Sequence, residues 1–231
     1  MIPAEYCNLN FPNTIKKWDE AVPLGNGDLG CLIWGGPSAL RFSIDKGDLW
    51  DCTGGPVAGG EYTYRNLIRL VKKKRQREIV RIFDLPYYKA TPTKLPAGKI
   101  ILDLKTSGNV KSSLRLSDAS AAVETGGVVL NSFISASRPL GMIRINSTDF
   151  QIEPPAYGDP DRRHWKKWLQ NKKAISQSLK NICYEPSRSE KIESGGACTQ
   201  YFIQTIPGDR CYGIFLYILR RESETVAAYT V

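Results

Sequence analysis

The sequence predicts a mainly β protein, built as a large antiparallel β-sandwich with one or two helical excursions. Short strand-like apolar runs recur along the 231 residues, and turn-forming Gly, Pro and Asn residues separate them. In Leu40–Ile44 apolar and polar residues alternate, which is typical of a strand with one buried face. Hydrophobic residues make up 42% of the chain and charged residues 24%, a globular balance that excludes disordered and collagen-like chains.

The strands can be placed in order along the chain. Cys31–Trp34 and Leu40–Ile44 flank the turn Gly35–Ser38, so this pair is predicted to form a β-hairpin. Further strands are expected at Lys99–Leu104, Ser113–Leu116, Val128–Ile134, Met142–Ile145, Tyr212–Leu219 and Thr225–Val231. Helices do not alternate regularly with these runs, which argues against parallel βαβ units.

Two inserts interrupt the strands. The first covers about 64–83, where apolar residues at helical spacing share one face of a single predicted helix. The second covers about 154–182 and combines a Pro- and Gly-rich loop, Phe150–Pro160, with a weaker helical segment, Asp161–Ile182. We therefore expect one domain, residues 1–231, that carries both inserts.

The chain is basic, with 32 Lys and Arg against 23 Asp and Glu and a net charge of +9. Such a charge favours acidic partners such as nucleic acid, anionic lipid or anionic polysaccharide. Much of the excess lies in Lys72–Arg77 and Arg162–Lys173, and charge runs of this kind are usually solvated faces. The chain has no recognised nucleic-acid motif and no apolar run of about 18–20 residues. We therefore expect neither a nucleic-acid nor a membrane partner.

Histidine and cysteine content limits the possible chemistry. His164 is the one histidine, which argues against His-dependent triads and multi-histidine metal sites, and its default interpretation is a surface residue. The six cysteines form no C-x-x-C pair, so neither zinc nor iron–sulfur binding is supported, and Cys31 is expected to be a buried free thiol. We expect no metal and no cofactor. Met1–Tyr6 lacks the features of a signal peptide, and the sequence assigns no compartment.

A glycine-rich segment near the N-terminus is the most distinctive local feature. Gly25–Gly30 fits G-x-G-x-x-G, but dinucleotide binding needs a strand before the first glycine and a helix after the last. Here Pro23 interrupts the preceding run, and the strand-like Cys31–Trp34 follows. We interpret the segment as a turn, in which glycine permits positive φ or the close approach of another backbone segment.

Aromatic and acidic residues surround this turn in the sequence. The aromatic set could stack on sugar rings, although tryptophan is more often a core residue; its members are Trp18, Trp34, Trp50, Tyr62, Tyr64, Tyr87 and Tyr88. A glycosidase needs two carboxylates at a fixed separation. The nearby candidates are Asp19, Glu20, Asp28, Asp45, Asp48 and Asp51. Sequence spacing pairs none of them, so no catalytic residue is assigned.

The stretch Trp18–Gly36 resembles the N-terminal sandwich domain of glycoside hydrolase family 95, the α-L-fucosidase-like enzymes. The matching pattern is W-x-E-A-[LMV]-P-[LI]-G-N-G-x-[LM]-G, and Asp45–Asp51 and Lys94–Leu104 resemble two further family segments. The resemblance covers roughly residues 1–145. It implies a galactose-mutarotase-like supersandwich that precedes an (α/α) barrel, and in the family this barrel holds the catalytic groups.

The chain also departs from the family pattern. Family 95 members usually carry L-N-E where this chain has Ile44-Asp45-Lys46, so we do not carry over fucose specificity. Nothing in the chain resembles the barrel, so the resemblance implies no catalytic residue here and a sandwich cut from a longer protein. We expect a non-catalytic domain that packs on the barrel and helps to shape its sugar site, with carbohydrate as ligand.

The resemblance and the residues together give a set of candidate positions. The substrate rim or domain interface is expected at Trp18, Asn26, Asp28 and Trp50, and the structural turn at Gly25, Gly27 and Gly30. Three alternatives remain open: a purely structural glycine turn, a free-standing carbohydrate-binding module, and nucleic-acid binding through the basic helix.

Overall fold

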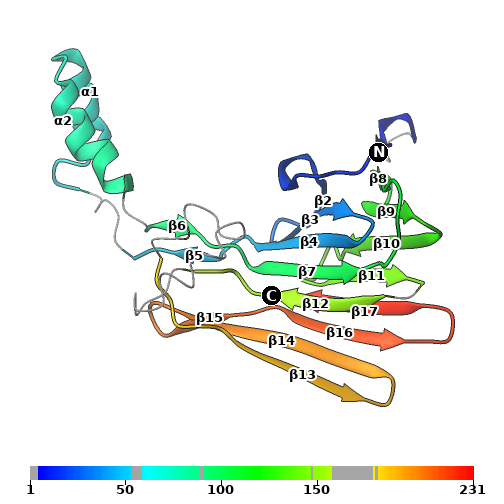
Figure 1. Ribbon diagram of the computed structural model, residues 1–231. Coiled ribbons are helices and arrows are strands. Elements are labelled where there is room, and N and C mark those ends of the chain that lie inside the picture. Colours follow the sequence, from blue (N-terminus) through cyan, green and yellow to red (C-terminus); the bar gives the residue numbers. More distant parts are fainter. Residues whose placement is uncertain (1–4, 54–58, 89–90, 147, 158–178, 180–181) are drawn as a thin grey trace.

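Two antiparallel β-sheets face each other and form the body of the molecule (Figure 1). The computed structural model describes residues 5–53, 59–88, 91–146, 148–157, 179 and 182–231. The mainly β sandwich expected from the sequence is therefore confirmed.

The larger sheet has ten strands, and it contains both the first and the last strand of the chain. Its order is β1 (Leu9–Phe11), β8 (Lys111–Arg115), β9 (Ser120–Thr125), β10 (Val128–Ile134), β11 (Gly141–Ile145), β17 (Thr225–Thr230), β16 (Phe215–Arg220), β14 (Ala197–Ile206) and β13 (Arg188–Ser194), with β15 (Arg210–Tyr212) also paired to β14. The last strand, β17, lies beside β11 in the middle of the sheet. Strands from distant parts of the chain thus pair with each other in one sheet.

The smaller sheet carries the segments singled out in the sequence. Its order is β12 (Asp149–Glu153), β7 (Gly98–Asp103), β4 (Ala39–Lys46), β3 (Leu29–Gly36) and β2 (Val22–Gly25). A separate short ribbon pairs β5 (Trp50–Asp51) with β6 (Thr93–Lys94). Short 3₁₀ turns are η1 (Glu5–Cys7), η2 (Trp18–Glu20) and η4 (Leu85–Tyr88).

Alternating apolar residues of the two sheets form the core. Along β3 and β4 every second residue is buried, so Ile33 and Phe42 face the other sheet while their neighbours face outward. Phe42 meets the ring of Tyr229 edge-on, with the centroids 6.5 Å apart. Each fully buried side chain of this size contributes about 1.5–3 kcal/mol, so the pairing of the two layers is the main stabilising contact.

Tyr229 occupies space that a glycine leaves open. Gly141 is its strand partner, and a Cβ at Gly141 would lie 2.0 Å from the Tyr229 ring. The phenol therefore lies over the bare backbone of β11, inside the core.

The insert at 64–83 is a helical hairpin, so the prediction of one continuous helix is wrong. α1 (Tyr64–Lys72) ends where Lys74 adopts φ 54°, and α2 (Gln76–Ile79) then leads into the π-helical turn η3 (Val80–Asp84). The Arg75 and Lys74 amides donate to the carbonyls of Leu70 and Val71, at 3.0 and 2.9 Å, which is a Schellman cap. Figure 1 shows this hairpin standing away from both sheets.

Most predicted strands are present, with two corrections. The β3–β4 hairpin and the strands β7, β8, β10, β11 and β17 are confirmed, whereas Tyr212–Leu219 is split between β15 and β16. The split occurs at Gly213, where a Cβ would lie 1.8 Å from the Phe202 carbonyl oxygen. The expected loop Phe150–Pro160 begins as strand β12, and most of Asp161–Ile182 lies outside the described residues.

Gly141→Ala should destabilise the chain strongly, because the new methyl group would collide with the Tyr229 ring. We expect a loss of about 2–3 kcal/mol in the free energy of unfolding, measured by urea denaturation. Gly36→Ala is the matched control, because nothing lies within 4 Å of its Cβ position, and it should change stability by less than about 1 kcal/mol. Equal losses in the two variants would contradict this account of the core.

Candidate functional site

Asn26 joins the two sheets at one edge of the sandwich. Its side-chain amide nitrogen donates to the carbonyls of Ser135 and Arg138, at 2.8 and 2.9 Å, in the loop between β10 and β11. Its side-chain oxygen accepts from the amides of Asp28 and Leu29, at 3.0 and 2.8 Å. Both N–H donors of the side-chain amide and its acceptor oxygen are thus bonded to backbone groups of the protein itself.

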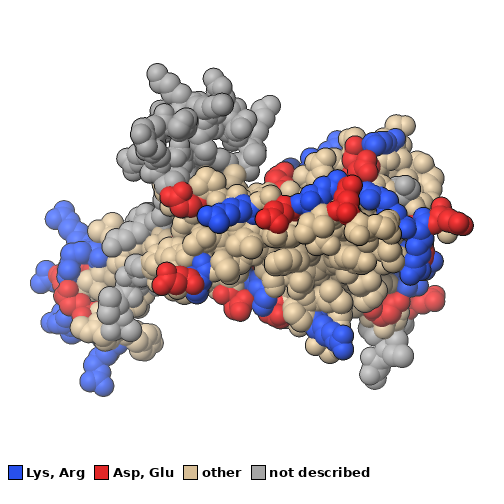
Figure 2. All heavy atoms as spheres, turned by 90° about the horizontal axis from the view of Figure 1, so that it is seen from below, with Lys and Arg blue, Asp and Glu red and all other residues tan. Residues whose placement is uncertain are grey.

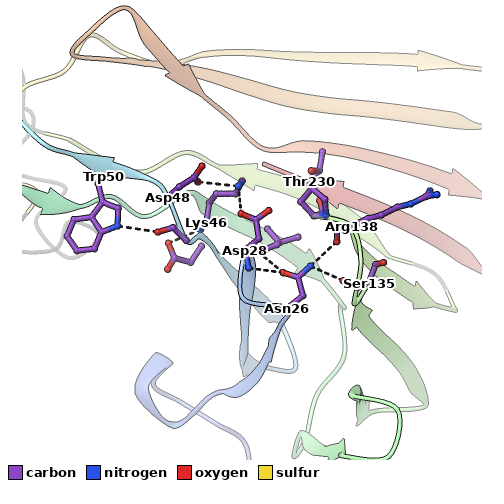
Figure 3. A network of polar contacts seen from close by, with 12 residues as sticks. Asn26, Asp28, Lys46, Asp48, Trp50, Ser135, Arg138 and Thr230 are labelled. Carbon is purple, nitrogen blue, oxygen red and sulfur yellow. Dashed lines mark hydrogen bonds and ion pairs between the residues drawn. The ribbon is translucent and has the colours of Figure 1, made fainter.

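The loop that Asn26 reaches is also held from the other side. Thr230, on β17, donates its hydroxyl to the Pro139 carbonyl at 2.6 Å. The Ser135 amide donates to the Leu140 carbonyl at 2.9 Å and closes the loop. Figure 3 shows Asn26 and Thr230 approaching the loop from opposite sides.

The glycines of the β2–β3 turn differ in what they contribute. Gly27 has φ +92°, which only glycine adopts readily, while Gly25 and Gly30 have no such φ. A Cβ at Gly25 would lie 3.4 Å from the Leu29 carbonyl, and one at Gly30 would meet nothing closer than 3.9 Å. The sequence did not single out Gly47, where a Cβ would lie 3.1 Å from the Gly27 carbonyl oxygen.

Charged and aromatic side chains continue the line from Asn26 along the same edge (Figure 3). Lys46 binds the carboxylate of Asp28, and it also pairs with Asp48 at 3.2 Å. The Gly47 amide donates to the Asp28 carbonyl at 2.7 Å, and the Trp50 indole N–H donates to the Gly47 carbonyl at 3.2 Å. We call the turn 26–28 and the loop 45–50 together the loop edge.

Trp18 lies on a groove beside this edge. The groove has a volume of about 730 Å³ and crosses the outer face of the smaller sheet. Its floor is a cross-strand row of Pro23, Leu32, Ser43, Lys99 and Glu153. Asp45 and Lys94 line it too, and they form an ion pair at 2.5 Å. Because Lys94 is the strand partner of Trp50, the groove adjoins the loop edge.

None of the three described tryptophans, Trp18, Trp34 and Trp50, is fully buried in the core, which corrects the commoner expectation. Trp18 is 62% exposed and Trp50 is 44% exposed. Trp34 is half-buried on the outer face of β3, where its indole N–H donates to the Ser43 hydroxyl at 2.9 Å and the Arg41 guanidinium lies over its ring. Tyr64 is exposed on α1, and Tyr62 packs on Phe83 within the helical hairpin. The side chains of Tyr87 and Tyr88 lie outside the described residues.

Asp51 is a buried carboxylate that sequence reasoning did not distinguish from its neighbours. Burial opposes its ionisation, but hydrogen bonds from Thr53 and Tyr184 outweigh burial and hold the pKa of Asp51 below its usual range. The Tyr184 ring packs on Tyr157, and the Tyr157 hydroxyl lies 2.6 Å from that of Tyr212. No local signal could reveal this cluster, because Asp51 and Tyr184 are 133 positions apart.

Asp48, on the loop edge, lacks the electrostatic environment of a glycosidase general acid. Lys46 is the main cause that lowers the pKa of Asp48, which keeps this carboxylate ionised. A glycosidase general acid needs the opposite, a raised pKa. Asp19 and Glu20, the remaining acidic candidates, are exposed on η2.

The described residues also bear on the cysteine and metal expectations. All six cysteines are free thiols, and burial raises the pKa of Cys31 to about 12, so its assignment as a buried thiol is confirmed. In this part of the chain, no three His, Cys, Asp or Glu side chains are grouped to hold a metal ion. No helix among the described residues is long and apolar enough to cross a membrane. His164 lies outside the described residues.

Comparison with known proteins identifies the family. The profile described as "Glycosyl hydrolase family 65, N-terminal domain" matches residues 9–175, which is most of the chain. The chain belongs to this family. The match includes the loop edge, the whole smaller sheet, the β5–β6 ribbon, and strands β1 and β8 to β11 of the larger sheet. The expectation of an N-terminal sandwich domain of a glycoside hydrolase is therefore confirmed.

A curated relative points in the same direction over a shorter stretch. The chain is 42% identical over 49 residues to alpha-L-fucosidase 2 of Arabidopsis thaliana. The match covers 21% of this chain and 6% of that protein. The chain is thus similar to a small part of a much longer protein.

Asn26→Ala should lower the free energy of unfolding by about 2–3 kcal/mol, because it removes four hydrogen bonds at a half-buried position. Asn26→Asp should do no better, because a carboxylate would face the carbonyls of Ser135 and Arg138. Urea unfolding of the isolated chain measures both losses. Asp28→Ala is the control: it removes an exposed ion pair and should cost less than about 1 kcal/mol. An Asn26→Ala loss as small as that of Asp28→Ala would refute the inter-sheet role.

The tyrosine cluster should make the chain sensitive to alkali. Burial raises the pKa of Tyr157 to about 12 and, with the Asp51 carboxylate, raises that of Tyr184. These phenols ionise more readily in the unfolded chain, so their contribution is complete below pH 10 and is lost as the pH rises further. Tyr184→Phe should reduce the loss of unfolding free energy between pH 9 and 12 by about 1–2 kcal/mol. Tyr217→Phe, at an exposed position of β16, should keep the wild-type profile, and identical profiles for all three proteins would count against the cluster.

Proposed function

We propose that this chain is the non-catalytic sandwich domain of a longer glycoside hydrolase, and that its loop edge packs against the catalytic domain beside the sugar site. Asn26 is then a positioning residue, which holds the turn in place without touching the sugar. Asp28, Trp18 and Trp50 are the side chains that meet the partner domain or the rim of the sugar site. Gly27 supplies the backbone conformation that the turn needs.

The exposed tryptophans are the observation that carries this proposal. Trp18 and Trp50 expose 62% and 44% of their surface, although tryptophan is a residue that usually buries most of its area. Trp50 is the strand partner of Lys94, and Trp18 lines the same groove as the Asp45–Lys94 ion pair. Tryptophan is enriched at interfaces because it offers a large apolar ring and one N–H donor.

Membership of the family and the extent of the match also support the proposal. The family is defined by a domain at the N-terminus of glycosyl hydrolases. The matched stretch is 6% of the length of alpha-L-fucosidase 2, so most of that enzyme lies outside the region shared with this chain. An α-L-fucoside is accordingly the first substrate to test.

The experiment uses the longer polypeptide that we propose contains this chain. Trp50→Ala should lower kcat/KM for an α-L-fucoside about tenfold or more, because the ring is lost from the domain contact. The isolated chain should lose less than about 1 kcal/mol in the same variant, because the ring is already partly exposed there. Tyr217 is an aromatic residue of the larger sheet with 49% of its surface exposed, and Tyr217→Ala should leave kcat/KM unchanged.

Two outcomes would overturn the proposal. One is an unchanged kcat/KM in Trp50→Ala, and the other is an equal loss in Trp50→Ala and Tyr217→Ala. Absence of hydrolysis of any glycoside by the longer polypeptide would remove the enzyme assignment itself.

A free-standing carbohydrate-binding module is the second candidate, and the groove beside Trp18 favours it. An exposed indole ring at the side of a groove of about 730 Å³ is a place where a sugar ring can stack. Binding of a neutral oligosaccharide to the isolated chain, lost in Trp18→Ala and retained in Trp50→Ala, would support this function over domain packing.

A further inference from the structure

The helical hairpin carries much of the net positive charge of the chain, and the proposed function does not use it. Residues 59–88 contain eight Lys and Arg against three Asp and Glu, so they carry +5 of the net charge of +9. Figure 2 shows Lys and Arg side chains gathered at the end of the molecule that carries this hairpin. The charge is thus concentrated where the chain projects farthest from the sheets.

The Schellman cap places the basic residues at the tip of the hairpin. α1 ends at Lys72, the reversal occurs at Lys74, and α2 begins at Gln76, so Lys72–Arg77 wraps around the turn between the two helices. All these residues are exposed. Five positive charges therefore lie within six successive positions on a protruding turn.

Most of these charges have no acidic partner among the described residues. Arg75 lies 3.7 Å from Glu78, and Arg81, farther along, binds Glu61 at 3.0 Å. Lys72, Lys73, Lys74 and Arg77 make no ion pair with any described carboxylate. Cations near the end of α1 also complement its dipole, but Lys74 and Arg77 lie beyond that helix.

The hairpin supports this tip by its own packing. Leu70 and Ile82 are buried between its helical segments, and the Tyr62 and Phe83 rings pack 5.0 Å apart at the base. The Thr63 hydroxyl caps α1 by accepting from the Asn66 amide at 3.2 Å. Charge removal at the tip therefore touches none of the contacts that hold the hairpin together.

We propose that the hairpin tip binds an anionic polysaccharide and tethers the domain to it. The tip offers several cations to a polymer that carries repeated carboxylates or sulfates. It has no aromatic ring on which unpaired bases could stack, since Tyr64 lies at the other end of α1, and α2 has only four residues to enter a groove of DNA. The choice of a glycan over a nucleic acid rests on the proposed function as a glycoside hydrolase domain.

The test measures binding of the chain to polygalacturonate as a function of salt. Wild type should bind saturably at low salt, with an affinity that falls as ions are released into rising salt. Lys72→Gln/Lys73→Gln/Arg77→Gln should weaken binding about tenfold or more and make the salt dependence shallower. Gln keeps the helix propensity of Lys and Arg, so circular dichroism and the Tm should match wild type.

Matched variants separate this site from general basicity. Lys16→Gln/Lys111→Gln/Arg188→Gln removes the same charge from exposed positions outside the hairpin and should change the affinity less than twofold. Trp50→Ala should bind polygalacturonate as wild type does, and the hairpin variant should hydrolyse a neutral glycoside normally in the longer polypeptide. If the hairpin does not bind the polysaccharide, polygalacturonate binding changes alone, and if the loop edge does not pack on the catalytic domain, the Trp50→Ala kinetics show it. The two proposals can therefore fail separately.

Three results would overturn the proposal. These are no saturable binding of polygalacturonate by wild type, equal weakening by the hairpin and control variants, and tighter binding of duplex DNA than of polygalacturonate at matched salt. The last result would make the tip a nucleic-acid contact instead.

Discussion

The side-chain amide of Asn26 is the contact on which the arrangement of the loop edge depends. The two sheets meet through an apolar core, which is strong but not directional, so it does not by itself fix how loops at the edge are oriented. Asn26 adds that direction: two donors reach the β10–β11 loop and one oxygen orders its own turn. The loop of the larger sheet and the turn of the smaller sheet therefore keep a fixed relation.

The loop edge next to Asn26 is held together by different contacts from those of the core. In the core, Tyr229 fills the space above Gly141, and neighbouring side chains leave little freedom. At the edge, lysine–carboxylate pairs and a backbone contact at Gly47 hold the loop while leaving Trp50 partly exposed. A rigid frame that presents exposed aromatic rings is what a docking edge needs, because little side-chain entropy is lost on contact. The basic hairpin stands away from both sheets, beyond the β5–β6 ribbon that carries Trp50 (Figure 1).

The sequence predicted the parts of the fold that depend on neighbouring residues. Alternation revealed the β3–β4 hairpin, and the glycine turn was located, with Gly27 at positive φ. Contacts between distant residues were beyond its reach: Asn26 and Arg138 are 112 positions apart, and Asp51 pairs with a tyrosine 133 positions away. β13 was missed because all its residues are exposed, which removes the apolar alternation. The break at Lys74 was missed because lysine, unlike glycine, gives no signal for the left-handed conformation that caps α1.

Hydrogen–deuterium exchange is the most direct test of the claim that the loop edge faces a catalytic domain. Exchange would be compared between the isolated chain and the same residues within the longer polypeptide. If the loop edge faces a catalytic domain, exchange at residues 45–50 and around Trp18 should be slower in the longer polypeptide, and exchange in β13 and β16 of the larger sheet should be unchanged. Protection confined to β13 and β16, or equal exchange at all residues in the two proteins, would contradict the proposed contact of the loop edge.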